Sequence, residues 1–243
     1  MSIMLSLKGR KAAILGGSAG IGLATAALLQ ERGAEVTIGG RDEARLGEAE
    51  AVLASGAKAF RVDATDADSL RSFYQQAGPL DDLVVTVTRR GGAGPAESLA
   101  NADLPGAFTD KPAAHLRAVA QALPTLDRSG SVTLAGAGSA RSALPGTALL
   151  AAVNGAVEAA VAPLARELAP RRVNAVSPGV IETSWWETLP EADRRAAFTQ
   201  FAGQTPVGHN GTAEDVAHAI AALIENDYIT GVVLPCDGGL QLT

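Results

Sequence analysis

Four glycines, Gly16, Gly17, Gly20 and Gly22, have the spacing of a loop that could hold the phosphates of a nucleotide. They follow a short apolar run and open a stretch with helical spacing. Glycine lets the backbone turn sharply and approach a ligand closely, and the free N–H groups at a helix start attract an anion. An ordinary tight turn is the simpler alternative, but the position between a predicted strand and a predicted helix favours a dinucleotide pyrophosphate.

The second apolar run ends at Gly40 and Arg41, the next residues that could do chemistry. A site for NAD usually places an acidic side chain there, on the ribose hydroxyls. Gly40 has no carboxylate, whereas the guanidinium of Arg41 can hold a 2′-phosphate in a forked geometry. We therefore favour NADP(H) over NAD(H), with a solvated arginine as the alternative.

Asp63 stands just after the third apolar run. Its carboxylate can accept a hydrogen bond from an adenine amino group, or it can close a turn before Thr65. The sequence leaves both roles open.

The elements that must position these residues follow from the pattern of apolar runs. Between most runs lie stretches with helical spacing, such as Ala156–Leu168, where Pro163 can introduce a kink. Alternating strands and helices predict an α/β fold whose parallel sheet is covered by helices on both faces. We expect Arg89–Pro95 and Glu182–Val207 to be long connections over the carboxyl edge of the sheet, where open α/β folds bind ligands. The predicted strands are Lys11–Leu15, Glu35–Ile38, Lys58–Val62, Leu83–Val87, Val132–Leu134, Arg172–Val176 and Val232–Leu234.

Composition narrows the range of partners. The net charge is −6 over 243 residues without any lysine- or arginine-rich block, so we expect neither nucleic acid nor an anionic membrane as a partner. The single Cys236 excludes an intramolecular disulfide, and the scattered His115, His209 and His218 show no metal-ligand spacing, so no metal is expected. The N-terminus has no signal-peptide layout and no long apolar run occurs, which favours a cytoplasmic location.

Longer motifs extend the glycine loop into a family pattern. The loop Gly16–Gly22, the pair Val62-Asp63 and the run Leu164–Gly179 together resemble the short-chain dehydrogenase/reductase family. Tyr228–Gly231 and Cys236–Gly239 extend the resemblance over essentially the whole chain. It implies one doubly wound, Rossmann-like domain over residues 1–243 with a seven-stranded parallel sheet, and an oxidoreductase that acts on a small carbonyl or alcohol.

The same resemblance implies a homodimer or homotetramer, formed through the helices near Pro112–Leu123 and Ala156–Leu168. It also implies that the segment Pro178–Thr183 meets the nicotinamide, although proline and glycine alone can shape such a loop. The cofactor contacts that the resemblance implies are Gly16, Ser18, Ala19, Ile21, Arg41, Asp63, Ala64, Thr86, Val87, Pro178, Gly179, Ile181 and Thr183.

The usual catalytic residues of the family are absent. Members usually carry a Tyr-x-x-x-Lys pair, but counting along the chain places Leu150 and Asn154 at those two positions. The serine position falls on Ala137, and the asparagine position falls on Lys111. No other register restores the pair, because no lysine stands four residues after either tyrosine of the chain. A leucine cannot pass a proton while a hydride moves.

Lys111 is the best candidate for a substitute proton donor, because its ammonium can polarise a carbonyl. Ser139 could replace the missing serine, with Arg89 or Arg90 assisting. The alternative for Lys111 is a solvated side chain near a helix start set by Pro112.

The missing groups leave other classes of function open. One is a catalytically inactive nucleotide-binding sensor or partner subunit, and a lower-ranked one is a non-redox elimination or isomerisation. Trp185 and Trp186 belong to the segment that closes over substrate in relatives. They are therefore either part of a lid over an apolar substrate or anchors of an interface.

Overall fold

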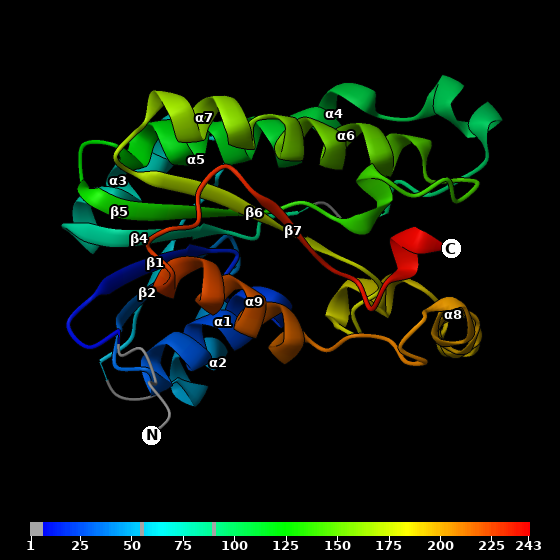
Figure 1. The fold of residues 1–243 in the computed structure, drawn as a ribbon, viewed down its shortest axis with the longest axis horizontal. Helices are drawn as coiled ribbons and strands as arrows, with labels where there is room; N and C mark the ends of the chain where they lie inside the picture. The colour runs from blue at the N-terminus through cyan, green and yellow to red at the C-terminus, as the bar shows by residue number, and fades with distance from the viewer. Residues whose placement is uncertain (1–6, 54–55, 89–90) are drawn as a thin grey trace.

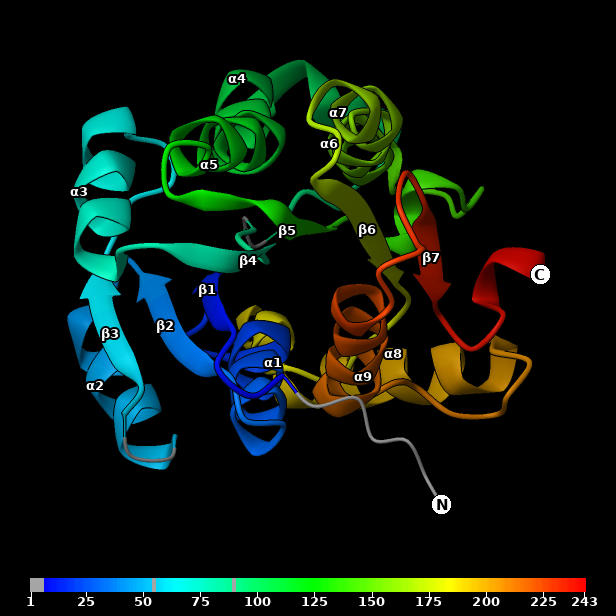
Figure 2. The same ribbon diagram turned by 60° about the vertical axis from the view of Figure 1, so that its left-hand side comes forward.

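Seven strands form one parallel sheet in the order β3-β2-β1-β4-β5-β6-β7 (Figure 1, with β3 labelled in Figure 2). The computed structural model describes residues 7–53, 56–88 and 91–243. The strand order reverses between β1 and β4, so the predicted doubly wound α/β sheet is confirmed. The strands are β1 (Lys11–Leu15), β2 (Glu35–Gly40), β3 (Lys58–Arg61), β4 (Leu80–Val85), β5 (Leu126–Ala135), β6 (Arg172–Pro178) and β7 (Val233–Cys236).

Helices cover both faces of the sheet, as Figure 2 shows. The helices on one face are α1 (Gly20–Glu31), α2 (Glu43–Val52) and α9 (Ala213–Glu225). The helices on the other face are α3 (Ala67–Ala77), α5 (Ala114–Ala122), α6 (Ala148–Ala159) and α7 (Val161–Glu167). Two further helices lie near the carboxyl ends of the strands, α4 (Leu104–Phe108) and α8 (Glu191–Gln204).

Each face of the sheet has its own apolar core. β6 is buried along its whole length, and it contributes Val173 and Ala175 to one core and Val176 to the other. A parallel strand covered on both faces needs no polar alternation, which is why the strands are visible in the sequence as continuous apolar runs.

The predicted helix Ala156–Leu168 is two helices in the structure. α6 begins eight residues earlier, at Ala148, and the helical path breaks at Ala160. Pro163 stands in the first turn of α7, where its missing N–H is tolerated. By length and composition alone the stretch Ala148–Glu167 could cross a membrane, but its Val157 and Val161 are buried in the core against the sheet.

The segment Glu182–Val207 is more than the plain connection predicted from the sequence. It contains a short 3₁₀ turn, Ser184–Thr188, and the whole of α8. No residue of α8 is buried, so this helix has no apolar face that a periodic pattern could reveal.

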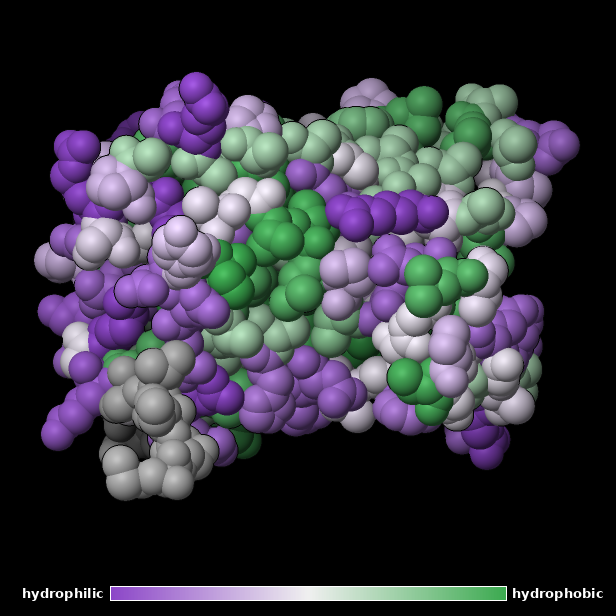
Figure 3. All heavy atoms as spheres, viewed as in Figure 1, coloured by the Kyte–Doolittle hydropathy of each residue, from purple (hydrophilic) through white to green (hydrophobic). Residues whose placement is uncertain are grey.

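β7 is an edge strand, and its residues are only partly buried. The space-filling view in Figure 3 shows an apolar area over β7 and the loop that leads to it, where Val232 is exposed. The predicted self-association of the chain stays a prediction.

Polar groups tie the amino edge of the sheet together. Arg10 holds Asp82 with two hydrogen bonds of 2.8 and 2.7 Å, and Ser131 donates to the same carboxylate at 2.6 Å. Arg172 donates to the carbonyls of Leu223, Ile224 and Ile229 and so closes the carboxyl end of α9. A buried carboxylate and a buried guanidinium are tolerated because they are paired or hydrogen-bonded in this way.

Candidate active site

The carboxyl edge of the sheet opens into a cleft of about 1420 Å³. Pockets for one small molecule are usually about 300–1,000 Å³, so this one has room for a dinucleotide and a second molecule. It lies at the switch between β1 and β4, where the Thr86 N–H donates to the carbonyl of Leu15 at 2.9 Å. All thirteen positions predicted to contact a cofactor line it: Gly16, Ser18, Ala19, Ile21, Arg41, Asp63, Ala64, Thr86, Val87, Pro178, Gly179, Ile181 and Thr183.

The glycine loop is packed so closely that side chains do not fit. Gly16 has φ +85°, and a Cβ on it would lie 2.7 Å from Thr86 Oγ1. A Cβ on Gly22 would overlap the Gly16 carbonyl oxygen. The loop therefore keeps the backbone close to any ligand that enters the cleft, as dinucleotide loops require.

The amino end of α1 offers its N–H groups to an anion. Its N-cap residue, Ala19, has no side chain that could cap the helix, and the first turn contains no acidic residue. By contrast α2, α3 and α9 are capped by the side chains of Asp42, Asp66 and Thr212. The uncapped turn at the floor of the cleft fits a pyrophosphate.

The end of the cleft that the sequence predicts to hold the adenosine is lined by two arginines rather than one. Arg41 lines it as predicted, and Arg45 on the first turn of α2 lines it as well. The sequence did not predict Arg45 at this site, because Arg41 precedes α2 and no helical spacing links the two arginines. Asp42 also lies here, with Arg45 Nε at 3.8 Å from its Oδ2.

Asp63 closes a turn. Its Oδ1 accepts hydrogen bonds from the N–H of Thr65 at 2.9 Å and from the hydroxyl of Thr65 at 2.7 Å. Partial burial raises the pKa of Asp63, but these bonds and the nearby charges of Arg41 and Arg61 together lower it below its ordinary value. The turn role is present in the structure, and a contact with adenine through the other oxygen stays a prediction.

The segment Pro178–Thr183 forms the side of the cleft opposite the glycine loop and approaches that loop at Thr183. A Cβ on Gly20 would lie 3.5 Å from Thr183, and a Cβ on Gly179 would lie 2.7 Å from Asp237 Cα. The Thr183 hydroxyl accepts a bond of 3.4 Å from the N–H of Trp185 and starts the 3₁₀ turn there. The pyrophosphate and nicotinamide ends predicted from the sequence thus belong to one continuous cleft.

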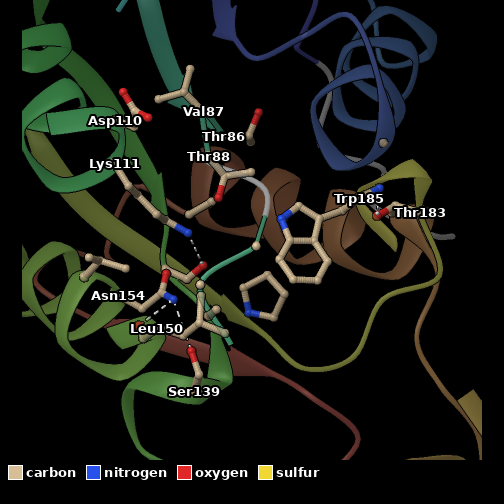
Figure 4. A pocket seen from close by; sticks show the side chains of 18 of the residues that line it. Thr86, Val87, Thr88, Asp110, Lys111, Ser139, Leu150, Asn154, Thr183 and Trp185 are labelled. Atoms are coloured by element: carbon tan, nitrogen blue, oxygen red, sulfur yellow. Dashed lines mark hydrogen bonds between the residues drawn. The ribbon is translucent and has the colours of Figure 1, made fainter. Parts of the chain in front are cut away.

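Lys111 lies at the other end of this cleft and is buried, with 7% of its surface exposed. Its Nζ donates to the carbonyl of Gly136 at 3.2 Å, as Figure 4 shows. The solvated alternative is therefore wrong. Pro112 does not set a helix start, because both residues lie in a π-helical turn, Thr109–Ala113, that joins α4 to α5. The turn packs against α6, and this packing shields the Lys111 side chain from solvent.

Burial changes the protonation of Lys111 and its neighbour. It lowers the pKa of Lys111 to about 8, against an opposing effect of the Glu158 carboxylate. Burial and the charge of Lys111 lower the pKa of His115 to about 3, so this imidazole is neutral. His115 Nδ1 donates to the backbone carbonyl of Lys111 at 2.8 Å and helps to fix the turn.

Leu150 and Asn154, at the family's tyrosine and lysine positions, lie near Lys111 (Figure 4), and Ala137, at the serine position, lines the same cleft. Asn154 Nδ2 donates to Ser139 Oγ at 3.1 Å and to the Leu150 carbonyl at 2.8 Å. Among the described residues, Asn154 Oδ1 has no hydrogen-bond partner. Leu150 and Ala137 line the cleft with apolar groups, whereas Lys111, Ser139 and Asn154 bring polar side chains to the same end of it.

Two tryptophans form the outer wall of the cleft. Trp186 is anchored, because its Nε1 donates to the Ile181 carbonyl at 3.0 Å and its ring packs edge-on against Phe198 with 5.5 Å between centroids. Trp185 packs against Trp186 at 5.0 Å and points into the cleft (Figure 4). Both line the cleft, which favours the lid interpretation over the interface one.

Other candidates are less informative. Arg89 and Arg90, named as possible assistants of Lys111, lie outside the described residues. Tyr74 is buried with its hydroxyl on the Ala118 carbonyl, and Tyr228 is 96% exposed, and neither lines the cleft. The described part of the chain contains no cluster of His, Cys, Asp and Glu that could hold a metal ion.

A glycine loop at the switch point of a doubly wound sheet, an uncapped helix start and a basic far end define a dinucleotide-binding α/β protein. A sequence model described as Enoyl-(Acyl carrier protein) reductase matches residues 16–241. The short-chain dehydrogenase/reductase ATR9 of Stachybotrys chlorohalonatus is 32% identical over 258 residues, covering 98% of this chain and 100% of that protein.

A further relative and a solved structure are also dehydrogenases by name. The cis-4-hydroxycyclohexanecarboxylate dehydrogenase of Sinomonas cyclohexanicum is 35% identical over 245 residues, covering 95% of this chain and 96% of the relative. A solved small-chain dehydrogenase in complex with NADPH has a TM-score of 0.83 and 30% identity, covering 96% of this chain and 98% of that one. The chain belongs to the short-chain dehydrogenase/reductase family of oxidoreductases, which use a nicotinamide dinucleotide.

Proposed function

We propose that this chain is an NADP(H)-dependent oxidoreductase that interconverts a small carbonyl compound and its alcohol, with Lys111 in place of the usual tyrosine as proton donor. The observation that carries the proposal is the buried ammonium of Lys111 at one end of the cleft that the glycine loop opens. When bound, the nicotinamide supplies or takes up the hydride.

The cofactor preference rests on the two guanidinium groups at the adenosine end. Arg41 and Arg45 can hold a 2′-phosphate, and Gly40 leaves space without offering a carboxylate to a ribose hydroxyl. Asp42 is already engaged by the N–H of Arg45, at 3.1 Å. A relative of this fold is named as a complex with NADPH, which supports the same preference.

Lys111 has the protonation that a general acid needs. With a pKa of about 8, roughly nine in ten molecules carry the proton at pH 7, and the desolvated ammonium releases it more readily than an exposed lysine. Ser139 presents a hydroxyl at the same end of the cleft, oriented by Asn154. In this scheme Lys111 donates a proton to the substrate oxygen during reduction and regains it from solvent afterwards.

The substrate class follows from the walls of the cleft. Leu150, Val153 and Trp185 line the cleft and offer apolar or aromatic contacts. Such walls favour a neutral, largely apolar ketone or aldehyde over a charged substrate.

The decisive experiment compares Lys111→Met with wild-type protein on a panel of apolar aldehydes and ketones with NADPH. We expect the variant to lose a factor of about 100 or more in kcat while its NADPH affinity stays within about threefold. Lys58→Met is the matched control, because Lys58 is exposed at the start of β3. Full turnover by Lys111→Met would sink the proposed role of the lysine.

The alternative of an inactive nucleotide-binding sensor or partner subunit predicts a different outcome of the same assay. NADPH would bind, measured by tryptophan fluorescence, and no carbonyl of the panel would be reduced by the wild-type protein. The relatives described above are named as enzymes, and nothing in them favours this alternative.

A further inference from the structure

A second buried charge lies behind the catalytic end of the cleft. Glu158 on α6 is 8% exposed and does not line the cleft. Its carboxylate accepts a hydrogen bond of 2.6 Å from the Ser177 hydroxyl and one of 3.1 Å from Arg141 Nε. Burying a carboxylate costs desolvation free energy even when it is hydrogen-bonded, so a buried glutamate at this place suggests a specific role.

Gly136 connects this carboxylate to Lys111. The Gly136 carbonyl accepts the hydrogen bond from Lys111 Nζ. On another side of the same residue, a Cβ would lie 2.7 Å from Glu158 Oε1, so only glycine lets the carboxylate approach this closely. The ammonium and the carboxylate thus contact one backbone residue from two different elements, the π-helical turn and α6.

We propose that Glu158 is the positioning residue for Lys111: its buried carboxylate keeps the ammonium charged and seated on the Gly136 carbonyl. Glu158 touches neither cleft nor substrate and acts only through Lys111. As a contribution to catalysis this role rests on the proposed function, whereas its effect on the charge of Lys111 does not.

Electrostatics in the same region support the proposal. Opposite charges in a poorly solvated region attract strongly, and the Glu158 charge is the neighbouring charge that raises the pKa of Lys111 against the effect of burial. His115 is neutral, and the Arg141 guanidinium is partly exposed and therefore screened. The charged or titratable groups on the elements around the turn are Asp103 at the start of α4, Asp110 on the turn, His115 and Arg117 on α5, Glu158 on α6, and Arg141 behind it.

The test is a direct titration of Lys111 by NMR. The chain has only four lysines, Lys8, Lys11, Lys58 and Lys111, so protein labelled with ¹³C-lysine gives four Cε signals that single Lys→Arg variants assign. The titration is run on wild-type protein, Glu158→Gln and Glu158→Asp. Glu225→Gln is the matched control, because Glu225 is a largely buried carboxylate, 11% exposed, paired with Arg32 at 2.6 Å on the opposite face of the sheet.

We expect Glu158→Gln to lower the pKa of Lys111 by about one pH unit, to about 7. Glu158→Asp keeps the charge, so its Lys111 should titrate within about 0.3 of the wild-type value, and Glu225→Gln should do the same. An unchanged Lys111 in Glu158→Gln would overturn the proposal. An equal fall in Glu158→Asp would also overturn it, because packing rather than charge would then be responsible.

The readout separates this inference from the proposed function. The titration needs no substrate, so absence of turnover refutes the catalytic role of Lys111 and leaves the coupling to Glu158 intact. In active protein, Glu158→Gln should move the basic limb of the kcat profile to lower pH by the same amount as the NMR titration. Its affinity for NADPH should stay at the wild-type value, since Glu158 does not line the cleft.

Discussion

Replacing Lys111 by methionine should stabilise the folded protein at neutral pH, because the fold bears the cost of burying an ammonium. The pKa of this lysine falls from 10.5 to about 8 on folding. At 1.36 kcal/mol per pH unit, that difference corresponds to about 3 kcal/mol. Loss of the bond to Gly136 offsets about 1 kcal/mol of it, which leaves a net gain of about 2 kcal/mol at pH 7.

The gain depends on pH in a defined direction. The folded pKa of Lys111 lies below the unfolded one, so between about pH 8 and 10.5 the unfolded chain binds more protons than the folded one. Raising the pH through this window therefore stabilises wild-type protein relative to Lys111→Met. Below about pH 8 the cost is fully present, and above about pH 10.5 it is gone.

Urea unfolding at pH 7, 8, 9 and 10 measures this difference directly. Subtracting the free energy of unfolding of wild-type protein from that of Lys111→Met cancels the other groups that titrate in the same range. Lys58→Met is the control, since an exposed lysine should give a small difference that does not change with pH. If the difference for Lys111→Met were also independent of pH, the ammonium would not be buried as described and the reasoning would be wrong.

Three other predictions concern the cofactor and substrate ends of the cleft. Arg41→Ala should weaken NADPH binding about tenfold or more and leave NADH binding nearly unchanged, as isothermal titration calorimetry can show; equal losses for both would argue against a 2′-phosphate site. Trp185→Ala should raise KM for apolar ketones by about tenfold with kcat within about twofold, and a change confined to kcat would contradict its role as a wall. Gly22→Ala should destabilise the fold by about 1–3 kcal/mol, measured by thermal denaturation, and abolish NADPH binding, because its Cβ would overlap the Gly16 carbonyl oxygen. Gly47→Ala on α2 is the control: a Cβ there meets open space, so this variant should be as stable as wild-type protein or more stable.

The sheet and the cofactor loop could be predicted from the sequence because their signals are local. An apolar run such as Lys11–Leu15 needs only its own residues to be recognised as a buried strand, and the strand and the prediction coincide. The conformational freedom of the glycines at residues 16–22 is a property of glycine itself, so the loop could be recognised without knowing what packs against it. α8 escaped prediction for the converse reason, since a helix that buries none of its residues has no apolar period.

By itself the sequence determined which groups are available for chemistry. They are a glycine loop, Arg41, and a lysine, Lys111, at the position where the family usually has an asparagine; no tyrosine stands four residues before any lysine. Only the tertiary structure decided what Lys111 is. Its low exposure comes from α6 and from Gly136 after β5, and the carboxylate that opposes its deprotonation stands at position 158. Solvation and charge act through space, so the state of this lysine depends on residues that the sequence places far away and the fold brings together.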